Sequence, residues 1–574
     1  MPTRTLDHRL PLPYRLPLHS MKKNTVWTTS TLLALSFSLS PIGAYAQTAP
    51  DAGQTLQQLQ PTPAAPRESQ PLKLQPAAPT GITLPGGGQV VLQSVRFSGN
   101  TAIPQETLQA AVAGSVGQSM DLAGLQALAS RTSALYRASG YPFATAFLPP
   151  QTLTTGALRI QIVEGRYGKV QAVGDDAPLV LKADRFLGSL QAGVVIETAA
   201  LERATLILDD QPGIKTLALM RPGEETGTGN LEVRITRERS ITGDAGVDNF
   251  GNRYSGEYRA RANLNINSPF TLGDQISLRL LGSDENLWLG SVGYGLPLGT
   301  SGLRGNVGYA YTRYMLGKEF AYLQANGTAI VSSAGLSYPL IRSQKTNLTL
   351  IGTYQYKELQ DNKDSTATHE SKASESTPLV LQFDRRDTLG GGGITYGSAT
   401  WTGGSLRMDT ALTAADSNQT RGSFNKLNLD VVRLQNLAAG WSLMGRFSMQ
   451  TASKNLDSSE KTSLGGPGGV RAYPTGEASG DEAMLAQLEL RYALGLYTPY
   501  LFMDSGIITV NTRPALGANN NQRTLSGSGL GLRYQNNGWN ADAALAWRTE
   551  GGAPQSDTSS DPAPRAWVSA GYKF

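Results

Sequence analysis

The chain has 574 residues, which is too long for one ordinary domain, so two to four units are expected. It contains no cysteine and three histidines, which excludes thiol catalysis, cysteine-ligated zinc and disulfide frameworks and nearly excludes a Ser-His-Asp triad or a histidine metal cluster. The formal charge of +5 does not indicate a nucleic-acid partner, because residues 1–46 hold five basic residues and one acid, and the rest carries 45 basic minus 44 acidic residues, or +1.

Residues 1–46 have the form of an upstream segment followed by a secretory signal peptide. A basic start, Met21-Lys22-Lys23, precedes a largely apolar run at 32–42 and a small-residue cleavage site that ends at Ala46. Both Met1 and Met21 remain open as the true start. No other stretch reaches the roughly 18 consecutive apolar residues that a spanning helix needs. We therefore expect an exported protein that is periplasmic, secreted or a β-barrel.

Residues 47–88 are predicted to be a proline-rich linker. Prolines recur from Pro61 to Pro85 with few large apolar side chains between them, which favours an extended and semi-rigid chain. Within this stretch, residues 55–60 have the composition to start a short helix.

From residue 89 the pattern changes to two compact α/β units, 89–165 and 166–239. In the first unit, apolar periodicity and turn residues predict strands at 90–97, 144–148 and 158–164 and helices at 104–112 and 122–139. In the second unit, the same signals predict strands at 170–173, 215–221 and 230–236 and a helix at 197–208. Each unit has about 75 residues, which is enough to bury one small core.

The last region, residues 240–574, has the period-two alternation that is typical of transmembrane β-strands. At 254–266 the even-numbered residues are apolar or glycine, whereas the odd-numbered residues are polar or charged and need a wet lumen. Similar alternation recurs at 275–280, 303–311, 426–432, 484–492 and 565–574. At roughly 20 residues for each strand and its connection, this region predicts about sixteen strands. The expected fold is therefore α+β domains followed by a transmembrane antiparallel β-barrel.

A soluble β-sandwich also shows alternation and is the alternative fold. The number of strands, the signal peptide and the final residues disfavour it. The even-numbered residues from Ala566 to Phe574 form one apolar face that ends on an aromatic C-terminus. Such an ending resembles the terminal strand by which outer-membrane barrels are recognised, so Phe574 is predicted to be a membrane-insertion terminus.

A glycine-rich run at 465–474 contains one strong cation, Arg471, and Asp504 follows it by thirty-three residues. Strand parity puts Asp504 on one face with Phe502 and Gly506, opposite the apolar residues of the same stretch, so we expect it to face the lumen. Because arginine and a carboxylate can pair through two hydrogen bonds, we predict a loop folded into the barrel and latched by Arg471 and Asp504. The alternative is a surface arginine and an unrelated lumen carboxylate.

Two other glycine-rich segments, 390–393 and 527–529, neither precede a predicted helix nor carry the lysine of a P-loop. We interpret both as turns between strands. The sequence predicts no catalytic residue, no metal site and no cofactor, so we expect the protein not to be an enzyme.

Several motifs resemble two-partner secretion transporters of the TpsB type, the haemolysin/haemagglutinin secretion-activation family, in the superfamily that includes barrel-assembly factors. The resemblance to a first POTRA domain is carried by YRASGY at 136–141, FLPPQ at 147–151, GAL at 156–158 and VEG at 163–165. Segments 210–213, 221–223 and 227–229 are similar to a second POTRA domain, and 383–387 to a mid-barrel motif. Residues 470–473 and 502–506 resemble the loop and strand motifs of the superfamily.

This resemblance marks a set of residues with expected roles. They are Gly140, Tyr141, Leu148, Pro149, Gln151, Glu164 and Gly165 in the first POTRA domain, Val470, Arg471, Ala472 and Tyr473 in the loop, and Phe502, Asp504 and Gly506 in the strand. Ala472 departs from the family, which usually has glycine there. If the loop requires a positive φ at that position, alanine would be strained.

The resemblance implies an outer-membrane barrel with both POTRA domains in the periplasm. A large secreted partner of the TpsA type is expected to dock unfolded on the POTRA domains, about residues 158–163 and 197–208, and to pass through the pore. Contacts with outer-membrane lipid and with the barrel-assembly machinery are implied, and nucleic acid is not. A plug helix in the resting barrel would have to come from residues 55–60.

Three other functions remain as alternatives. A barrel-assembly factor of the same superfamily is disfavoured by the two POTRA units and the motif at 147–151. An outer-membrane protease or lipase is disfavoured by the shortage of histidine. A passive porin or adhesin would not need two periplasmic domains.

Overall fold

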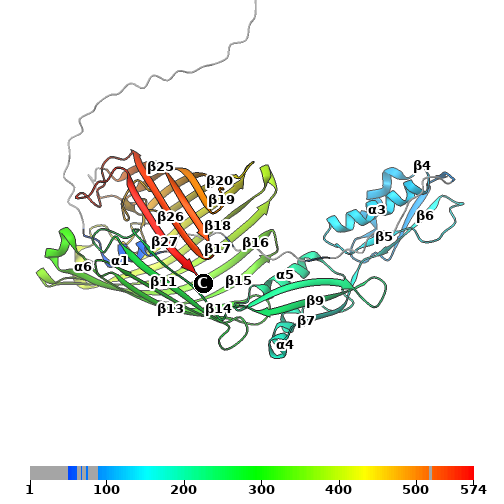
Figure 1. Cartoon of the computed structure of the whole chain (residues 1–574), viewed down its shortest axis with the longest axis horizontal. Coiled ribbons are helices and arrows are strands. Elements are labelled where there is room, and N and C mark those ends of the chain that lie inside the picture. Colours follow the sequence, from blue (N-terminus) through cyan, green and yellow to red (C-terminus); the bar gives the residue numbers. More distant parts are fainter. Residues whose placement is uncertain (1–48, 61–65, 67–72, 75–87, 516–519) are drawn as a thin grey trace, which may run out of the picture. The chain divides into compact units, whose positions relative to one another are not determined.

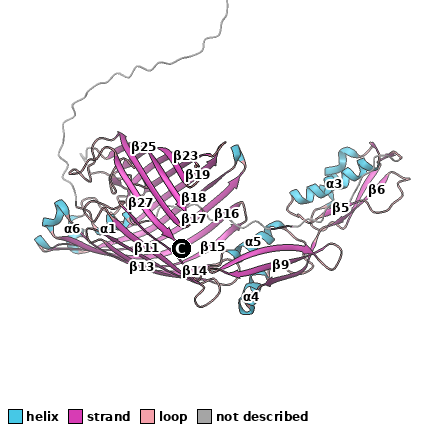
Figure 2. Ribbon diagram, viewed as in Figure 1, coloured by secondary structure: helices cyan, strands magenta, loops and turns pink. Residues whose placement is uncertain are grey.

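The computed structural model describes residues 49–60, 66, 73–74, 88–515 and 520–574. The predicted signal peptide at 1–46 and most of the predicted linker lie outside the described residues. Figures 1 and 2 show the strands of the barrel and the helices and sheets of the α/β units. Among the helices of the described part, none is long and apolar enough to cross a membrane. The domain boundaries proposed from the sequence stay predictions.

The first α/β unit is a three-stranded sheet covered by helices. Its elements are β2 (Val90–Val91), β3 (Ser94–Ser98), α2 (Gln105–Val112), η1 (Ala113–Ser115), β4 (Ser119–Met120), α3 (Leu122–Ala138), β5 (Thr145–Phe147) and β6 (Ala157–Val163). The strand predicted at 90–97 is therefore divided in two. The sheet order is β3-β6-β5, so β6 is central. Helix α3 begins where the Asp121 carboxylate accepts a hydrogen bond from the Gly124 N–H, and it buries Leu125 and Leu128 against the sheet.

The second α/β unit contains one helix that the sequence analysis does not predict. Its elements are β7 (Arg166–Val173), α4 (Ala177–Asp184), η2 (Arg185–Leu187), α5 (Thr198–Asp209), β8 (Ile214–Pro222) and β9 (Thr228–Arg237). The missed helix is α4. Its start has a clear local signal, because the Asp176 carboxylate accepts a hydrogen bond from the Leu179 N–H at 3.1 Å and a proline lies in the first turn.

A short strand from the linker joins the sheet of the second unit. Strand β1 (Lys73–Leu74) pairs in parallel with β8, with Lys73 opposite Leu219 and Leu74 opposite Met220. The complete sheet order is β1-β8-β9-β7. The edge of β8 thus accepts an extended segment through main-chain pairing.

The C-terminal region is a closed antiparallel barrel of sixteen strands, which confirms the predicted fold. The strands are β10 (Ile241–Asp248), β11 (Arg259–Asn267), β12 (Gln275–Ser283), β13 (Trp288–Pro297), β14 (Arg304–Met315), β15 (Ala325–Arg342), β16 (Thr346–Lys363), β17 (Thr368–Asp387), β18 (Gly393–Met408), β19 (Gly422–Asn436), β20 (Trp441–Ala452), β23 (Glu482–Tyr492), β24 (Tyr497–Thr509), β25 (Gln522–Asn536), β26 (Trp539–Glu550) and β27 (Arg565–Lys573).

The shorter elements of the barrel region lie in its connections. They are η3 (Lys318–Leu323), η4 (Asp364–Thr366), η5 (Leu389–Gly391), α6 (Thr410–Ala415), β21 (Thr462–Ser463) and β22 (Ser479–Gly480). Helix α1 (Ala52–Gln58) precedes the α/β units in the chain and contacts β14, β15 and β16. In Figure 1 it appears in blue within the outline of the barrel.

The barrel closes where β10 pairs with β27. The ladder between them has five residue pairs. Beyond its end, the Asn249 side chain continues the pairing, because its Nδ2 donates to the Ala566 carbonyl at 3.0 Å and its Oδ1 accepts from the Val568 N–H at 2.8 Å. At the other end, the terminal Phe574 exchanges backbone hydrogen bonds with Gly243 at 3.0 and 3.1 Å.

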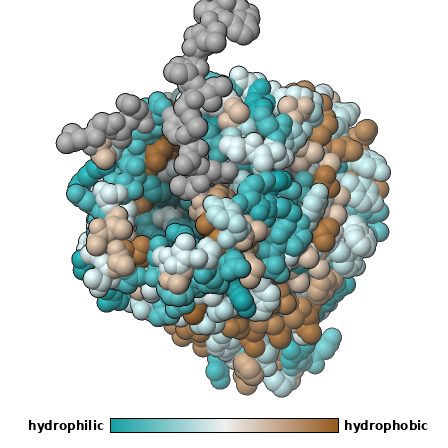
Figure 3. Space-filling model, turned by 90° about the vertical axis from the view of Figure 1, so that its left-hand side faces the viewer, coloured by the Kyte–Doolittle hydropathy of each residue, from teal (hydrophilic) through white to brown (hydrophobic). Residues whose placement is uncertain are grey.

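The outer surface of the barrel is apolar and bounded by aromatic residues, as a lipid environment requires. Near the end where the chain enters from the second α/β unit, three aromatic pairs have ring centroids 4.9, 5.3 and 4.9 Å apart: Trp441–Tyr492, Tyr497–Tyr534 and Trp539–Tyr572. Near the opposite end, Trp288 lies 6.0 Å from Tyr311. Figure 3 shows hydrophilic residues around the hollowed end of the barrel and hydrophobic residues on its flank.

The strand predicted at 254–266 begins only at Arg259. Tyr254 is 1% exposed and packs edge-to-face on Phe320, with ring centroids 4.8 Å apart. Both rings belong to an apolar cluster that includes Ala52 of α1 and Leu359 of β16. Small and polar residues happen to continue the alternation through this inward-turning loop, and alternation alone does not separate such a loop from a strand.

Candidate functional site

Alternate side chains of β24 point into the barrel lumen. Tyr500, Phe502 and Asp504 are 4%, 5% and 0% exposed, whereas Leu501 and Met503 are 59% and 56% exposed on the outer surface. Asp504 therefore lies on the lumen wall.

The loop between β20 and β23, residues 453–481, folds back into the barrel. Strands β21 and β22 pair at its stem. Its glycine-rich tip is closed by hydrogen bonds from the Val470 N–H to the Leu464 carbonyl at 2.7 Å and from the Gly466 N–H to the Tyr473 carbonyl at 3.1 Å. Gly466 has a φ of +106°, which favours glycine. Val470 and Tyr473 are fully buried, so the tip is packed inside the lumen.

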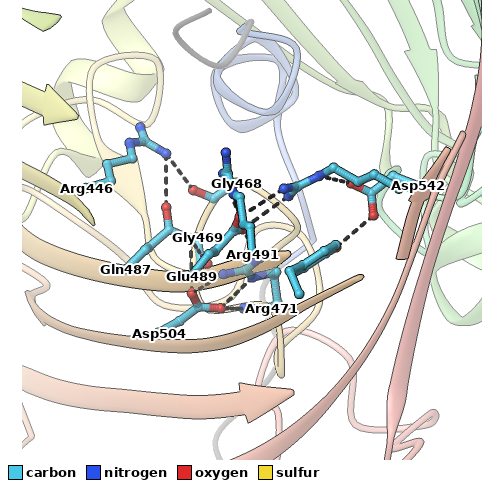
Figure 4. A network of polar contacts seen from close by, with 11 residues as sticks. Arg446, Gly468, Gly469, Arg471, Gln487, Glu489, Arg491, Asp504 and Asp542 are labelled. Carbon is cyan, nitrogen blue, oxygen red and sulfur yellow. Dashed lines mark hydrogen bonds and ion pairs between the residues drawn. The ribbon is translucent and has the colours of Figure 1, made fainter. Parts of the chain in front are cut away.

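Arg471, at the tip of this loop, is bonded to two carboxylates of the lumen wall (Figure 4). Its Nε and Nη2 donate to Asp504 at 2.8 and 2.6 Å, and its backbone N–H donates to the same carboxylate at 3.1 Å. Its Nη1 donates to Glu489 of β23 at 2.6 Å. Such charge-assisted, bidentate pairs are stronger and more directional than neutral hydrogen bonds. The structure thus brings Arg471 and Asp504 together and fixes the orientation of the tip.

Further contacts attach the loop tip to the same wall. The guanidinium carbon of Arg471 lies 3.6 Å from the centroid of the Phe502 ring, a cation–π contact. Trp567 of β27 donates from Nε1 to the Arg471 carbonyl at 2.7 Å. Gln487 of β23 donates to the Gly469 carbonyl at 2.8 Å. The tip is therefore held by side chains of β23, β24 and β27 together.

Glu489 is a residue of this site that the sequence analysis missed. It accepts hydrogen bonds from Arg491 at 2.8 Å and from Arg533 at 3.0 and 3.2 Å, in addition to that from Arg471. Arg533 in turn donates to Asp542 at 2.7 Å. The available signal is strand parity, because Glu489 occupies an inward position of β23 that lies opposite Phe502.

Glycines on β25 make room for the loop and for the aromatic ring beside it. A Cβ at Gly527 would lie 2.5 Å from the Cβ of Ala472, and a Cβ at Gly529 would overlap the Phe502 ring. The prediction that 527–529 is a turn is therefore wrong, because these glycines lie within a strand whose missing side chains leave space. The segment 390–393 does lie at the connection between β17 and β18.

Ala472 is accommodated without backbone strain. It is absent from the residues with positive φ in the described chain, so alanine meets no conformational penalty there. Its side chain is 3% exposed and occupies the space that Gly527 leaves open. The departure from the family's usual glycine is thus matched by a glycine on the facing strand.

Helix α1 is the second element inside the barrel. It begins three residues before the predicted segment 55–60, because the Asp51 carboxylate caps it by accepting a hydrogen bond from the Gln54 N–H at 2.8 Å. Gly53 faces the loop so closely that a Cβ there would overlap Ser458. Helix and loop are therefore in direct contact.

Ion pairs and hydrogen bonds anchor both ends of α1. Lys372 of β17 lies 3.4 Å from the Asp51 carboxylate and 2.9 Å from Asp457 of the loop, so it contacts both elements. At the other end of the helix, Arg279 of β12 donates to the Leu59 carbonyl at 2.8 Å. A cation at this position also complements the negative end of the helix dipole.

The root of the loop, which is the segment before β21, carries a second group of buried ion pairs. Glu460 is 3% exposed and lies 2.5 Å from Lys357 and 2.9 Å from Lys426. Burial by itself raises the pKa of Glu460, but the charges of Lys426 and Lys357 outweigh burial and lower that pKa to about 2. Glu460 therefore stays ionised at physiological pH.

Comparison with known proteins identifies the family. The sequence profile described as haemolysin secretion/activation protein ShlB/FhaC/HecB matches residues 227–534, which is more than half of the chain. The chain belongs to this family. A profile of the ShlB-type POTRA domain matches residues 90–165. Membership places the barrel in the outer membrane and the POTRA domains in the periplasm, and it assigns the protein to two-partner secretion.

Relatives of the family resemble the chain over most of its length. The heme/hemopexin transporter protein HuxB of Haemophilus influenzae (strain 86-028NP) is 28% identical over 74% of this chain and 77% of its own length. The outer membrane transporter CdiB of Dickeya dadantii (strain 3937) is 23% identical over 70% of this chain and 72% of its own. The structure of CdiB from Escherichia coli has a TM-score of 0.70 at 20% identity, covers 87% of this chain and 94% of that one, and shows the same fold.

In the first POTRA domain, the family motif residue Glu164 is a buried carboxylate that connects the backbone of residues 101–102 to helix α3. It accepts hydrogen bonds from the N–H groups of Thr101 at 2.5 Å and Ala102 at 2.7 Å and from the Tyr136 hydroxyl at 2.9 Å. Burial by itself raises the pKa of Glu164, but these hydrogen bonds outweigh it and lower the pKa below its usual value. The next residue, Gly165, has a φ of +70°.

The other marked POTRA residues shape the domain and its junction. Gly140 ends α3 with a φ of +93°, and its carbonyl accepts a hydrogen bond from the Thr198 N–H of the second domain at 2.9 Å. Tyr141 packs against the apolar core. The Gln151 side chain pairs with the backbone of Arg159 through two hydrogen bonds of 2.8 Å. The remaining two lie in the same segment: Leu148, which packs against the core, and Pro149.

One of the two segments predicted to dock the partner is not free to accept an added strand. Segment 158–163 lies in β6, whose two edges are occupied by β3 and β5, so it cannot accept an added strand. The alternation of apolar residues shows which side chains are buried but not which strand lies at the edge of the sheet. The sequence therefore does not show that β6 is the central strand. Segment 197–208 covers most of α5, where Arg203 donates to the Pro339 carbonyl at 2.8 Å and Glu202 accepts from the Gln344 N–H at 3.2 Å. That face of the helix contacts the end of β15 and the turn that follows it.

Proposed function

We propose that the protein exports an unfolded TpsA-type partner through its barrel to the cell surface. The partner docks on the POTRA domains, displaces the elements that close the lumen and leaves without nucleotide hydrolysis. The protein acts as a conduit and not as an enzyme. The observation that carries this proposal is the nature of the closure, since ion pairs and hydrogen bonds, in addition to apolar packing, attach loop 453–481 and α1 to the lumen wall.

Such a closure suits a reversible gate. Ion pairs and hydrogen bonds that break during opening can be replaced by contacts with water and with the backbone of an entering chain, so part of their free energy is recovered. A plug held by apolar contacts alone would have to expose the whole of its interface to water on each opening. The polar contacts of Arg471, Lys372 and Arg279 therefore favour a gate that opens and recloses.

The edge of β8 supports docking of an extended partner. The linker strand β1 pairs there with the backbone of Leu219 and Met220, so this edge suits main-chain pairing with an extended segment, and the partner would take the place of β1. Main-chain pairing depends little on side chains, and pockets beside the strand then select the partner. A cavity of about 370 Å³ lies next to the end of β8, between the two POTRA domains, lined by residues that include Phe143, Met220 and Glu225.

The energy for export has to come from the partner. The glycine-rich segments at 390–393 and 527–529 are a strand connection and part of a strand, and neither has the loop-to-helix geometry of a phosphate-binding site. Folding of the partner outside the cell would prevent its return and bias its diffusion outward.

The barrel also contacts membrane lipid through its apolar belt, and its terminal strand, ending at Phe574, would contact the assembly machinery; no nucleic acid takes part.

A barrel-assembly factor is the alternative function. Lateral delivery of a client into the membrane would require a ladder of the barrel to open, and the five pairs between β10 and β27 form the shortest ladder among the sixteen barrel strands. Export through the lumen does not require this opening. The two functions therefore predict different effects of a covalent bond across the seam, the ladder between β10 and β27.

The decisive experiment is co-expression with a large exported protein encoded beside this one. Secretion of that protein into the medium in the presence of the full chain, and its retention in the absence of the chain, is the expected result. A chain that lacks residues 89–239 should insert and conduct ions in lipid bilayers but should not secrete. Undiminished secretion by this deletion would contradict docking on the POTRA domains.

A further inference from the structure

A polar cavity of about 620 Å³ opens at the outer rim of the barrel. The described residues that line it come from the extracellular loops that follow β18, β20 and β24 and from the start of β19. Each loop contributes one cation to its lining: Arg421, Lys454 and Arg513. The fold thus gathers three positive charges from distant parts of the sequence.

A buried asparagine holds the three loops together. Asn455 is 5% exposed, and its Nδ2 donates to the carbonyls of Asn418 and Arg513, both at 2.8 Å. Its Oδ1 accepts a hydrogen bond from the Arg513 N–H at 2.7 Å. The position of the cations therefore follows from a specific tie between the loops and not from chance proximity on a mobile surface.

The three cations outnumber the carboxylates beside them. None of the three belongs to an ion pair among the residues that the structure describes. Lys454 donates to the Arg421 carbonyl at 2.6 Å, and Arg513 donates to the Ser453 carbonyl at 2.9 Å. The nearby carboxylate of Asp416 accepts a hydrogen bond from the Arg421 N–H at 2.9 Å. The site therefore combines three positive charges with one negative charge.

The cavity lies just beyond the apolar belt, within reach of lipid headgroups. Ser423, which lines it, faces outward on the same side of β19 as Leu427, and Leu427 is paired with the exposed Trp401 of the apolar belt. Four residues separate Ser423 from Leu427, or about 14 Å along the strand. With the usual tilt of barrel strands, this is about 10 Å beyond the belt. Headgroups extend several ångströms beyond the hydrocarbon of a bilayer, and long arginine side chains reach toward them.

We propose that this cavity binds the phosphorylated headgroup of the outer-leaflet glycolipid, lipid A. The guanidinium groups of Arg421 and Arg513 match phosphate oxygens through paired N–H donors, and Lys454 adds a point charge. The outward position selects a lipid over a free anion, because the acyl chains lie along Leu427 while the phosphate enters the cavity. The site rests on the outer-membrane location of the barrel and is independent of whether the partner passes through the lumen.

The test uses the purified full chain in detergent micelles with bis-phosphorylated lipid A as the probe, measured by native mass spectrometry. Each cation near an anionic lipid surface contributes about fivefold to binding, so Arg421→Gln with Arg513→Gln should weaken lipid A binding by roughly 25-fold. The variant with Arg421→Lys and Arg513→Lys should lose far less of its binding of lipid A. Arg407→Gln is the matched control, since Arg407 is an exposed arginine near the same rim that already pairs with Glu375.

Two further arms distinguish the source of the phosphate. The wild type should bind lipid A without phosphates as weakly as the double glutamine variant binds bis-phosphorylated lipid A. Inorganic phosphate at millimolar concentration should not displace the lipid. Equal binding of lipid A by the wild type and the double glutamine variant would overturn the proposal, and so would equal weakening by Arg407→Gln. Displacement of the lipid by inorganic phosphate would assign the cavity to a free anion instead. Heat-modifiable migration of every variant checks that the barrel is folded.

Discussion

Replacement of Arg471 by alanine is the sharpest test of the loop latch. In the wild type, the Arg471 side chain makes two hydrogen bonds to Asp504 and one to Glu489, and Asp504 is 0% exposed. Removal of one partner of a buried ion pair costs about 3–5 kcal/mol, because the other charge stays buried without compensation. Glu489 keeps two other arginines, so most of this cost falls on Asp504.

This free energy sets the size of the expected effect. At the lower bound of about 3 kcal/mol, the ratio of latched to released loop falls by more than a hundredfold. We expect secretion of the partner to fall, because a released loop no longer holds one defined position in the lumen. Barrel insertion should not change, since the sixteen strands keep their hydrogen bonds. Arg471→Lys should be intermediate, because lysine keeps the charge but loses the paired geometry and the stacking on Phe502.

The assay compares three properties of each variant: partner protein in the medium, heat-modifiable migration of the barrel, and protease cleavage of loop 453–481 in intact cells. Arg491→Ala is the matched control, because Arg491 pairs with the same Glu489 but belongs to the wall and not to the loop. Asp504→Asn should reproduce the effect of Arg471→Ala. Wild-type secretion and an uncleaved loop in Arg471→Ala, at normal barrel levels, would refute the latch.

Three further changes test other contacts. Gly527→Ala should loosen the loop, because its methyl would lie 2.5 Å from the Cβ of Ala472, and adding Ala472→Gly should restore protease resistance. A disulfide between Val247→Cys and Ala570→Cys, which face each other across the seam, should leave secretion unchanged, whereas loss of secretion on oxidation would favour lateral exit. The pKa of Glu164 is depressed by folding, so its stabilisation is present above its unfolded pKa of about 4.3 and is lost as pH falls through the folded pKa. The protection of backbone amides in the first POTRA domain, corrected for the intrinsic exchange rate at each pH, should therefore fall in acid, and Glu164→Gln should remove that dependence.

The architecture of the barrel is predictable from sequence because lipid imposes a strict rule on side chains. Arg259 and Arg261 cannot face lipid, so their spacing fixes which residues of β11 point inward. The rule says nothing about where a strand ends, and the loop around Tyr254 obeys the alternation while it turns into the lumen. Helix α4 is short, and its start at Asp176 is a local signal that a search for long periodic segments overlooks.

The site is predictable only in part, because its partners depend on register and closure. Motif and strand parity place Arg471 and Asp504 in one compartment, and the structure brings them together. Glu489 joins them because β23 pairs with β24 in a particular register, and Trp567 joins them because β26 and β27 follow β25 around the wall. Neither relation can be obtained from spacing along the chain, since a shift of one residue would turn each side chain outward.

The two elements in the lumen have separate anchors, and this has a consequence for the order of opening. Arg471 bonds to the wall formed by β23 and β24, whereas α1 bonds to β12, β16 and β17, and Lys372 is the one cation among the described ion pairs that contacts both α1 and the loop. Lys372 lies nearer to Asp457 of the loop than to Asp51, at 2.9 against 3.4 Å. Departure of α1 would therefore leave Lys372 paired with Asp457, and the root of the loop would keep its charge balance. Departure of the loop first would instead break three ion pairs, those of Asp457 with Lys372 and of Glu460 with Lys357 and Lys426, where departure of α1 breaks one, which makes it the costlier order. The ion pairs thus favour release of the helix before the loop.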